Sequence, residues 1–241
     1  MSEFRIRVAG QTAKITTVSE NVRSFFRDFL TEEEPAIRLQ ITREAIAAEL
    51  PSVAAFARPG TDIAYDAEVQ VIFQRLSEAL VPFGAFLFHG AALAVGRDGF
   101  LFTGNSGIGK STHMLRWLRR CPDAEAINGD KPFIVAGAQP LVCGTPWGGK
   151  EGITSTLTVP LRAIVLLERA EENRIRQVPL AGIFPMLCQQ IYRPDDANIT
   201  RQTLRLLKSL DGAVSFWRFE CNNFRDDCFP TAYRALTGRE P

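Results

Sequence analysis

The chain has 241 residues, which is enough for one large domain, or a domain with a small partner, and enough to bury a core. Hydrophobic residues make up 46% and charged residues 23%, as in ordinary soluble proteins, so the composition excludes a disordered or fibrous chain. The 28 Lys and Arg residues nearly balance the 27 Asp and Glu residues. This balance argues against nucleic acid or an anionic membrane as the main partner.

The cysteines and the N-terminal residues give information about the cellular compartment of the protein. The five cysteines are odd in number and form no CxxC pair, so we expect free, mostly buried thiols instead of a disulfide framework or a zinc site. Apolar and charged residues alternate from Phe4 to Val8, which predicts a strand and not a signal peptide. The apolar stretches are too short and too interrupted to span a bilayer. We therefore expect a cytoplasmic protein.

Residues 1–82 are predicted to form a small α+β domain. The residue pattern predicts three strands and three helices, in the order strand, strand, helix, strand, helix, helix, over residues 4–8, 13–18, 21–30, 36–41, 44–49 and 68–80. The clearest loop is residues 58–62, which contain Pro59 and Gly60.

Residues 83–241 are predicted to form an α/β nucleotide-binding domain. Apolar strands at residues 85–88, 91–95 and 100–103, with an Asp-Gly turn signal in residues 96–99, predict a β-hairpin that leads into a glycine-rich segment. Helical spacing from Met114 to Leu118 predicts a helix after that segment. Further strands are predicted at residues 126–127, 133–135, 141–142, 163–167 and 214–219, and further helices at residues 183–192, 199–210 and 231–236.

The glycine-rich segment matches the phosphate-binding pattern G-x-x-x-x-G-K-[ST], known as Walker A or the P-loop. In such a loop, backbone N–H groups and a helix N-terminus bind phosphate oxygens, the lysine reaches the β- and γ-phosphates, and the hydroxyl binds Mg²⁺. We therefore expect ATP and Mg²⁺ as cofactors, with Ser111 on the metal. The alternative is a glycine-rich turn that only caps a helix. The predicted nucleotide-binding residues are Gly104, Asn105, Ser106, Gly107, Ile108, Gly109, Lys110, Ser111 and Thr112.

A P-loop alone does not separate motors, kinases and GTPases. The Asn-Lys-x-Asp motif that reads guanine is absent from the sequence. The apolar run of residues 163–167 ends in Glu168, which is a formal candidate for the acid of an ATPase. The alternative is an ordinary carboxylate at a strand end, because the charged residues 171–174 that follow are typical of a solvated turn.

The residues around the P-loop resemble those of a known superfamily. His89-Gly90 lies before the loop, and Asn128-Gly129-Asp130 lies after it. This order resembles the HPr kinase/phosphorylase and phosphoenolpyruvate carboxykinase superfamily, and it is most similar to small HPr-kinase-like proteins of bacteria, some of them found beside peptide-modification genes. The resemblance covers about residues 85–236 and implies an α/β P-loop core. The similar stretches are Phe88-His89-Gly90, Gly109-Lys110-Ser111-Thr112-His113, Asp130-Lys131-Pro132 and residues 144–151.

The resemblance implies that His89 and Asp130 lie beside the γ-phosphate, with Asp130 as general base or metal ligand. The chemistry agrees, since an attacking alcohol must lose its proton and a nearby carboxylate can accept it. The alternatives are a histidine satisfied at a strand start and an aspartate in a turn. Lys150 is a candidate for neutralising transition-state charge, against a lysine that is only solvated. We expect His113 to be structural.

Two departures from the family narrow the prediction. Gly129 stands where the family usually has a second acid, which argues against a two-metal or relay scheme. The glycine-and-acid signature with which HPr kinase engages its substrate is absent, so HPr is not the expected acceptor.

The sequence therefore predicts an ATP- and Mg²⁺-dependent kinase for a hydroxyl, with a serine of a peptide or protein, such as a precursor peptide, as acceptor. The alternatives are a small-molecule kinase, a non-catalytic nucleotide-binding regulatory module, and an ATPase that uses Glu168. A homo-oligomer is compatible with all of these.

Overall fold

The computed structural model describes residues 2–240. The contacts within the chain divide it into two compact units, Met1–Phe83 and Gly84–Pro241. Each unit contains its own sheet and buries its own apolar side chains.

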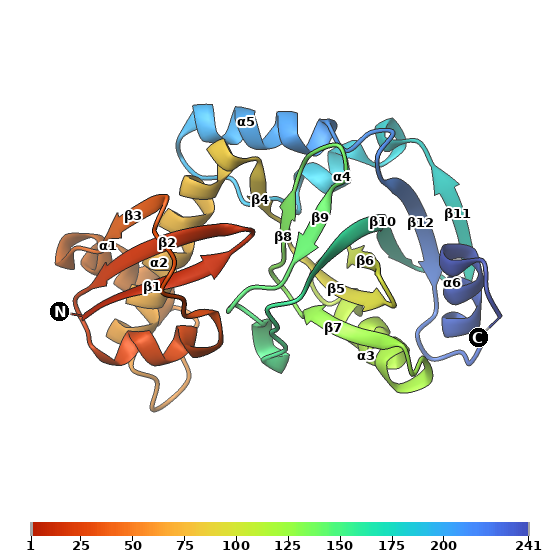
Figure 1. The fold of residues 1–241 in the computed structure, drawn as a ribbon. Coiled ribbons are helices and arrows are strands. Elements are labelled where there is room, and N and C mark those ends of the chain that lie inside the picture. Colours follow the sequence, from red (N-terminus) through yellow and green to blue (C-terminus); the bar gives the residue numbers. More distant parts are fainter. Residues whose placement is uncertain (1, 241) are drawn as a thin grey trace. The chain divides into compact units, whose positions relative to one another are not determined.

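The first unit combines a three-stranded sheet with helices (Figure 1). Its strands are β1 (Ser2–Val8), β2 (Gln11–Thr17) and β3 (Ile37–Gln40). The central strand β2 pairs antiparallel with β1 and parallel with β3. Its helices are the 3₁₀ helix η1 (Asn21–Phe29), α1 (Arg43–Ala54), α2 (Ile63–Leu80) and the short 3₁₀ helix η2 (Val81–Phe83).

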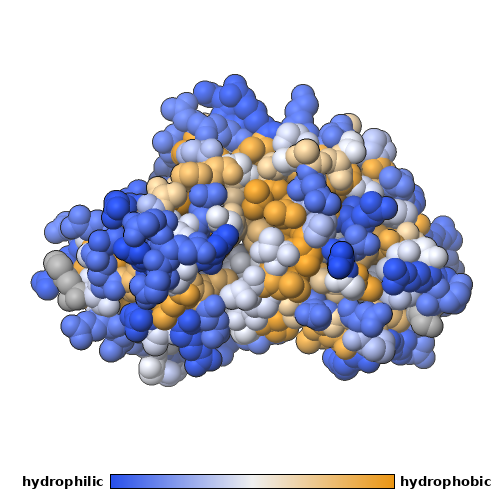
Figure 2. All heavy atoms as spheres, viewed as in Figure 1, coloured by the Kyte–Doolittle hydropathy of each residue, from blue (hydrophilic) through white to orange (hydrophobic). Residues whose placement is uncertain are grey.

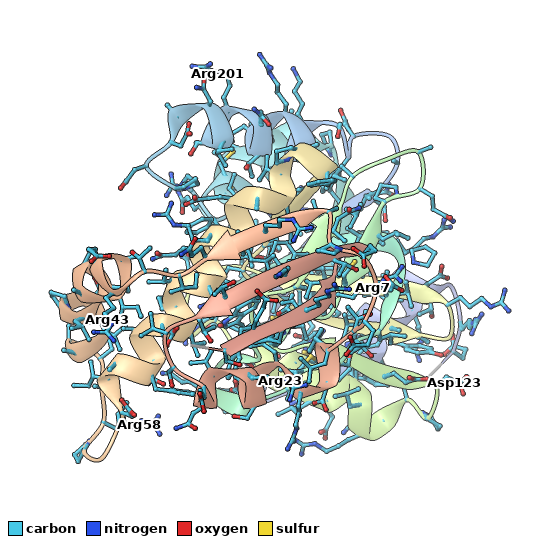
Figure 3. All side chains as sticks on the ribbon, turned by 60° about the vertical axis from the view of Figure 1, so that its left-hand side comes forward. Arg7, Arg23, Arg43, Arg58, Asp123 and Arg201 are labelled. Atoms are coloured by element: carbon cyan, nitrogen blue, oxygen red, sulfur yellow. The ribbon has the colours of Figure 1, made fainter. Side chains whose placement is uncertain are left out.

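Local signals in the sequence explain where these helices begin. The Thr42 and Asp62 side chains accept hydrogen bonds from backbone N–H groups in the first turns of α1 and α2, as N-caps do. The helix predicted at residues 21–30 is present as the 3₁₀ helix η1, and it stops where Leu30 forms a bridge with Ile6. Arg7 lies on β1 and pairs with Glu33 (Figure 3).

The second unit is built on a large mixed sheet, which confirms the predicted α/β class. The strand order is β4-β8-β9-β10-β6-β5-β7, with β12 beside β10 and β11 beside β12. Its strands are β4 (Ala85–Leu87), β5 (Gly90–Val95), β6 (Asp98–Thr103), β7 (Ala124–Asn128), β8 (Phe133–Val135), β9 (Leu141–Cys143), β10 (Thr158–Arg169), β11 (Arg174–Val178) and β12 (Ser215–Cys221).

Strand direction in this sheet brings several segments to one edge. Strands β6, β10 and β12 run parallel, so the residues that follow them lie along the same edge of the sheet. Strand β5 runs the other way and begins at that edge, where Gly90 pairs with Thr103. Strand β7 is antiparallel to β5 and ends there. We call this the carboxyl edge, since ligands of open α/β sheets bind outside the carboxyl ends of the strands.

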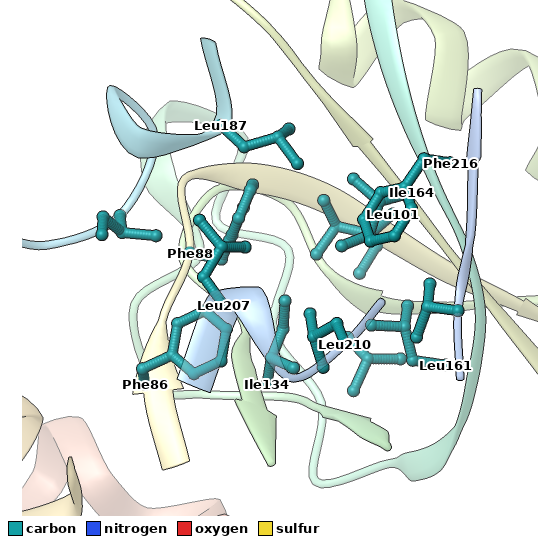
Figure 4. Packing of buried hydrophobic residues seen from close by; sticks show 14 of the residues in the cluster. Phe86, Phe88, Leu101, Ile134, Leu161, Ile164, Leu187, Leu207, Leu210 and Phe216 are labelled. Carbon is teal, nitrogen blue, oxygen red and sulfur yellow. The ribbon is translucent and has the colours of Figure 1, made fainter. Parts of the chain in front are cut away.

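Two separate hydrophobic clusters lie against the strands of this sheet. On one face, α3 (Lys110–Arg120) and α6 (Cys228–Thr237) bury Trp117 among Phe100, Phe102 and Phe229. On the other face, the side chains of Phe88, Leu101 and Leu207 belong to a second cluster, shown in Figure 4. That cluster draws on β4, β8, β9, α4 (Phe184–Cys188) and α5 (Ala197–Lys208). The remaining 3₁₀ helices are η3 (Gly149–Glu151) and η4 (Leu180–Gly182).

Three details of the second unit differ from the sequence prediction. The hairpin turn is tighter than residues 96–99, because Val95 pairs directly with Asp98. The helix predicted at residues 183–192 is only the short α4, since the residues after it are used to pair with the β4 segment: Ile191 forms a bridge with Phe88. Strand β11 was not predicted; it carries the charged residues Arg174 and Arg176 and pairs only with β12.

The surface and the cysteines agree with the composition. Hydrophilic residues cover much of the face shown in Figure 2, and Arg201 on α5 points away from its helix in Figure 3. The five cysteines are free, and all but the half-buried Cys188 are buried, as expected. Among residues 2–240, no helix has the length and apolar character needed to cross a membrane.

Candidate functional site

The glycine-rich loop, residues 104–109, joins β6 to α3 and lies at the carboxyl edge. Gly104 has φ 139°, and a Cβ atom there would lie 2.8 Å from the carbonyl oxygen of Leu167 on β10. Gly109 has φ 105°, and a Cβ atom there would collide with the Asn223 side chain. Both positions therefore require glycine, for the backbone conformation and for the close approach.

Lys110 is the cation of this loop. Its Nζ donates hydrogen bonds to the carbonyl oxygens of Gly104 and Asn105, at 3.0 and 3.3 Å. The side chain is buried, and this burial lowers the pKa of Lys110 below its usual 10.5, although the negative charge of Asp130 acts in the opposite direction. The ammonium group is therefore held in place by carbonyl groups of the glycine-rich loop itself.

The outer surface of the loop is open to solvent. Asn105, Ser106 and Gly107 are exposed, Ile108 and Ser111 are half-buried, and Thr112 is exposed in the first turn of α3. The first backbone N–H groups of a helix have no partner inside the helix, so this turn can donate to an anion. The Arg169 guanidinium donates to the Gly107 carbonyl at 2.8 Å and steadies the loop from β10.

His89, which lies between β4 and β5, and Asp130, which lies in the turn after β7, are predicted to act together, and they meet at the carboxyl edge. His89 Nε2 lies 3.4 Å from Asp130 Oδ1. Burial raises the pKa of Asp130, but the hydrogen bond with His89 and the charges of Lys131, His89 and Lys110 outweigh it, so the net pKa lies below the usual 3.8. Asp130 is therefore an ionised carboxylate at neutral pH.

His89 is oriented by groups that the sequence motif does not contain. Its Nδ1 lies 3.0 Å from Gln190 Oε1, and its backbone N–H donates to the Gln190 carbonyl. Its own carbonyl accepts a hydrogen bond from Thr103 Oγ1 at 2.8 Å, at the last residue of β6. The ring is thus fixed between the segment after α4 and the start of the glycine-rich loop.

Asp130 is held in its turn by the buried side chain of Asn128. Asn128 Oδ1 accepts from the backbone N–H groups of Asp130 and Lys131, at 2.9 and 2.6 Å. Its Nδ2 donates to Thr145 and to the Trp147 carbonyl. One amide therefore joins the Asp130 turn to the segment that contains Lys150.

That segment packs against Asp130 but leaves Lys150 exposed. A Cβ atom at Gly149 would lie 2.6 Å from Asp130 Cβ, so the backbone passes directly over the aspartate. Lys150 follows on η3 and is exposed, while Trp147 is buried. Lys150 thus lies on the Asp130 side of the site by its position in the chain.

Close packing explains why position 129 holds glycine and not a second acid. A Cβ atom there would lie 3.0 Å from the Gly148 carbonyl oxygen and 3.2 Å from Ile153 Cβ. A second acid at this position would require the 148–153 segment to move. The site therefore uses a single carboxylate at this turn.

The other candidates lie in structural settings. Glu168, at the end of β10, forms an ion pair with Arg218 at 3.5 Å. His113 is buried, and its Nε2 accepts from Trp117 Nε1 at 3.0 Å, so its structural role agrees with expectation.

No group of three His, Cys, Asp or Glu side chains within residues 2–240 could hold a metal by itself. Mg²⁺ keeps several waters and is usually bound through one or two carboxylates together with substrate phosphates, so it does not require such a group. Asp130 and the Ser111 hydroxyl are the side chains that would hold it.

Comparisons with known proteins found similarity only to solved structures. No family model matches it, and no curated protein matches it. One solved structure that matches is the HPr(Ser) kinase/phosphatase from Coxiella burnetii, at 14% identity and a TM-score of 0.29, over 51% of this chain and 88% of that chain. This likeness is too slight to transfer a site or a reaction.

Proposed function

We propose that this protein is a kinase that transfers the terminal phosphoryl group of ATP to a hydroxyl. The observation that carries the proposal is the position of the Asp130 carboxylate, 3.4 Å from His89 Nε2, at the same edge of the sheet as the glycine-rich loop, whose Lys110 contributes to lowering the pKa of Asp130. A phosphate-binding loop with a carboxylate base beside it is the arrangement that phosphoryl transfer to an alcohol needs.

The glycine-rich loop would bind the nucleotide through its backbone. The N–H groups of the first turn of α3 donate to phosphate oxygens, and the Lys110 ammonium exchanges the carbonyls of Gly104 and Asn105 for phosphate. The Ser111 hydroxyl would hold Mg²⁺, with Asp130 as the further candidate ligand, and the ion would neutralise charge on the phosphates when bound.

Asp130 would then act on the acceptor. As the hydroxyl oxygen forms its bond to the terminal phosphorus, the bond to the leaving nucleoside diphosphate breaks and the hydroxyl proton passes to the Asp130 carboxylate. His89 contacts the carboxylate, and Gln190 and Thr103 hold His89. Lys150, exposed beside Gly149, neutralises charge on the transferred group.

The acceptor class comes from the motif resemblance. The stretches around His89, Lys110 and Asp130 are similar to those of HPr-kinase-like proteins, so we assign a serine of a peptide or protein, a precursor peptide being the first candidate to test. The rival is a nucleotide-binding module that transfers nothing, and the lack of a second acid at Gly129 favours it.

The variant Asp130→Asn separates these functions. If Asp130 accepts the proton, its charge is needed in the transition state, so kcat should fall by about 10²- to 10⁴-fold while ATP affinity stays within a few-fold. The measurement is mass spectrometry of candidate peptides incubated with ATP and Mg²⁺, with calorimetry for ATP affinity. Asp211→Asn, an exposed aspartate of the same unit, is the matched control and should leave both quantities unchanged.

Two results would contradict the kinase. Equal transfer rates in wild type and Asp130→Asn would remove Asp130 from the chemistry. ATP binding without transfer to any tested peptide or small-molecule hydroxyl would favour the binding module. A shift of the Mg²⁺ dependence in the variant would identify Asp130 chiefly as a metal ligand.

A further inference from the structure

Phe224 is an apolar ring that the fold places in water. Its residue is 99% exposed, whereas the other phenylalanines of the second unit are buried or half-buried. It lies in the turn of residues 222–227, between β12 and α6. A single exposed apolar residue is not unusual, so any role for Phe224 depends on what lies beside it.

The turn that carries Phe224 is fixed by hydrogen bonds. The Phe224 backbone N–H donates to Asn222 Oδ1 at 3.0 Å, and the Asn222 N–H donates to Asn173 Oδ1 at 2.7 Å. Arg116 of α3 donates to the carbonyls of Asn223 and Arg225. The ring is therefore presented on an ordered turn and not on a loose loop.

The same turn touches the glycine-rich loop. The Asn223 side chain packs against Gly109, where a Cβ atom would collide with its amide. Arg116, which holds the turn, lies on α3 about 1.7 helical turns after Lys110. A ligand bound by the loop therefore has this turn as its neighbour.

The strand order then decides which end of a nucleotide lies near Phe224. Along the carboxyl edge the order is β7, β5, β6, β10, β12. Asp130 follows β7 and Phe224 follows β12, each two strands from β6 and on opposite sides of it, which is about 10 Å each way. With the terminal phosphate directed to Asp130, the base extends toward β12.

We propose that the Phe224 ring stacks against the base of the bound nucleotide, an assignment that rests on the proposed function. Any base offers a π-face to an aromatic ring, so the contact adds affinity without reading hydrogen-bonding groups. Phe224 thus binds the base while the glycine-rich loop binds the phosphates.

The test compares ATP with inorganic triphosphate, which lacks the base. Phe224→Ala should weaken ATP binding by about tenfold or more and leave triphosphate binding unchanged, while Phe224→Trp should retain ATP affinity. Calorimetry with both ligands measures this. Phe56→Ala, which removes another exposed phenylalanine in the first unit, is the matched control and should change neither affinity.

The outcomes distinguish the two proposals. If wild type binds neither ligand, the proposed function fails and this inference fails with it. If wild type binds both and Phe224→Ala binds ATP as wild type does, the stacking assignment alone is wrong. Equal losses for ATP and triphosphate would show that the ring only supports the loop, which also overturns the assignment.

Discussion

Lys110 links the charge of the site to pH. Burial lowers its pKa below 10.5, so the ammonium loses its proton at a lower pH than a free lysine does. As the pH rises, ATP affinity should therefore begin to fall before pH 10.5 is reached. The loss should be about tenfold or more once the charge is lost, because a hydrogen bond to a charged group contributes about 1.5–3 kcal/mol.

Calorimetry between pH 7 and 11 checks this. Phosphate favours the charged lysine, so binding should also take up protons in the alkaline part of that range, which buffers of different ionisation enthalpy reveal. A flat affinity across that whole range, with no proton uptake, would show that Lys110 does not contact the phosphates.

At the residue scale, Lys110 and the pairing of His89 with Asp130 can be predicted from the sequence, because these residues belong to short motifs. It does not lead to Gln190, which orients His89 from 101 residues away with no local pattern to mark it. Asn128 is visible in the Asn128-Gly129-Asp130 stretch, but its role as the buried link between two turns depends on a loop 17 residues further on. Phe224 belongs to no motif, and its exposure depends on the fold, so it could not be predicted from the sequence.

Among the elements, the Asp130 turn and the 145–147 segment depend on one side chain. Asn128→Ala leaves the N–H groups of Asp130 and Lys131 and the carbonyl of Thr145 without that partner. Each buried polar group left unsatisfied costs about 1–3 kcal/mol, so the free energy of unfolding should fall by about 3 kcal/mol. Urea unfolding measures this, with the exposed Asn198→Ala as control, which should change it by less than about 1 kcal/mol.

A loss below about 1 kcal/mol for Asn128→Ala would mean that water replaces the amide, and the turn would then not depend on it.

Most helices and strands follow from residue patterns, and the exceptions have physical causes. The β5–β6 hairpin and the helix after the glycine-rich loop are predicted because alternation and helical spacing are strong there. The α4 region is overpredicted because Ile191 is drawn into a bridge with Phe88, a tertiary pairing that overrides helical spacing. Strand β11 is missed because its alternation is masked by charged residues at a sheet margin.

The whole molecule consists of two units, and the hydrogen bonds and the ion pair described above for the glycine-rich loop, His89 and Asp130 all lie within the second. That unit also buries two hydrophobic clusters of its own. A fragment of residues 84–241 should therefore fold and bind ATP and inorganic triphosphate within a few-fold of the full chain. Circular dichroism and calorimetry check this, with residues 1–83 as the control that should bind neither.

A folded fragment 84–241 without ATP affinity would show that the first unit contributes to the nucleotide site. At this scale the sequence predicts the α/β class but not the strand order, because pairing partners such as β10 and β6 are far apart in the chain and share no local signal.

The burial of Lys110 has a consequence for the stability of the fold. Burial destabilises the charged form of this lysine, as its lowered pKa shows, so this part of the fold is locally frustrated. Its two carbonyl partners relieve this only in part. Under the proposed function, a polyphosphate would complete the compensation, and because the ammonium is already desolvated and oriented, that step would need little reorganisation. The loop would then be preorganised at the expense of folding stability, as is expected where local rules give way to function.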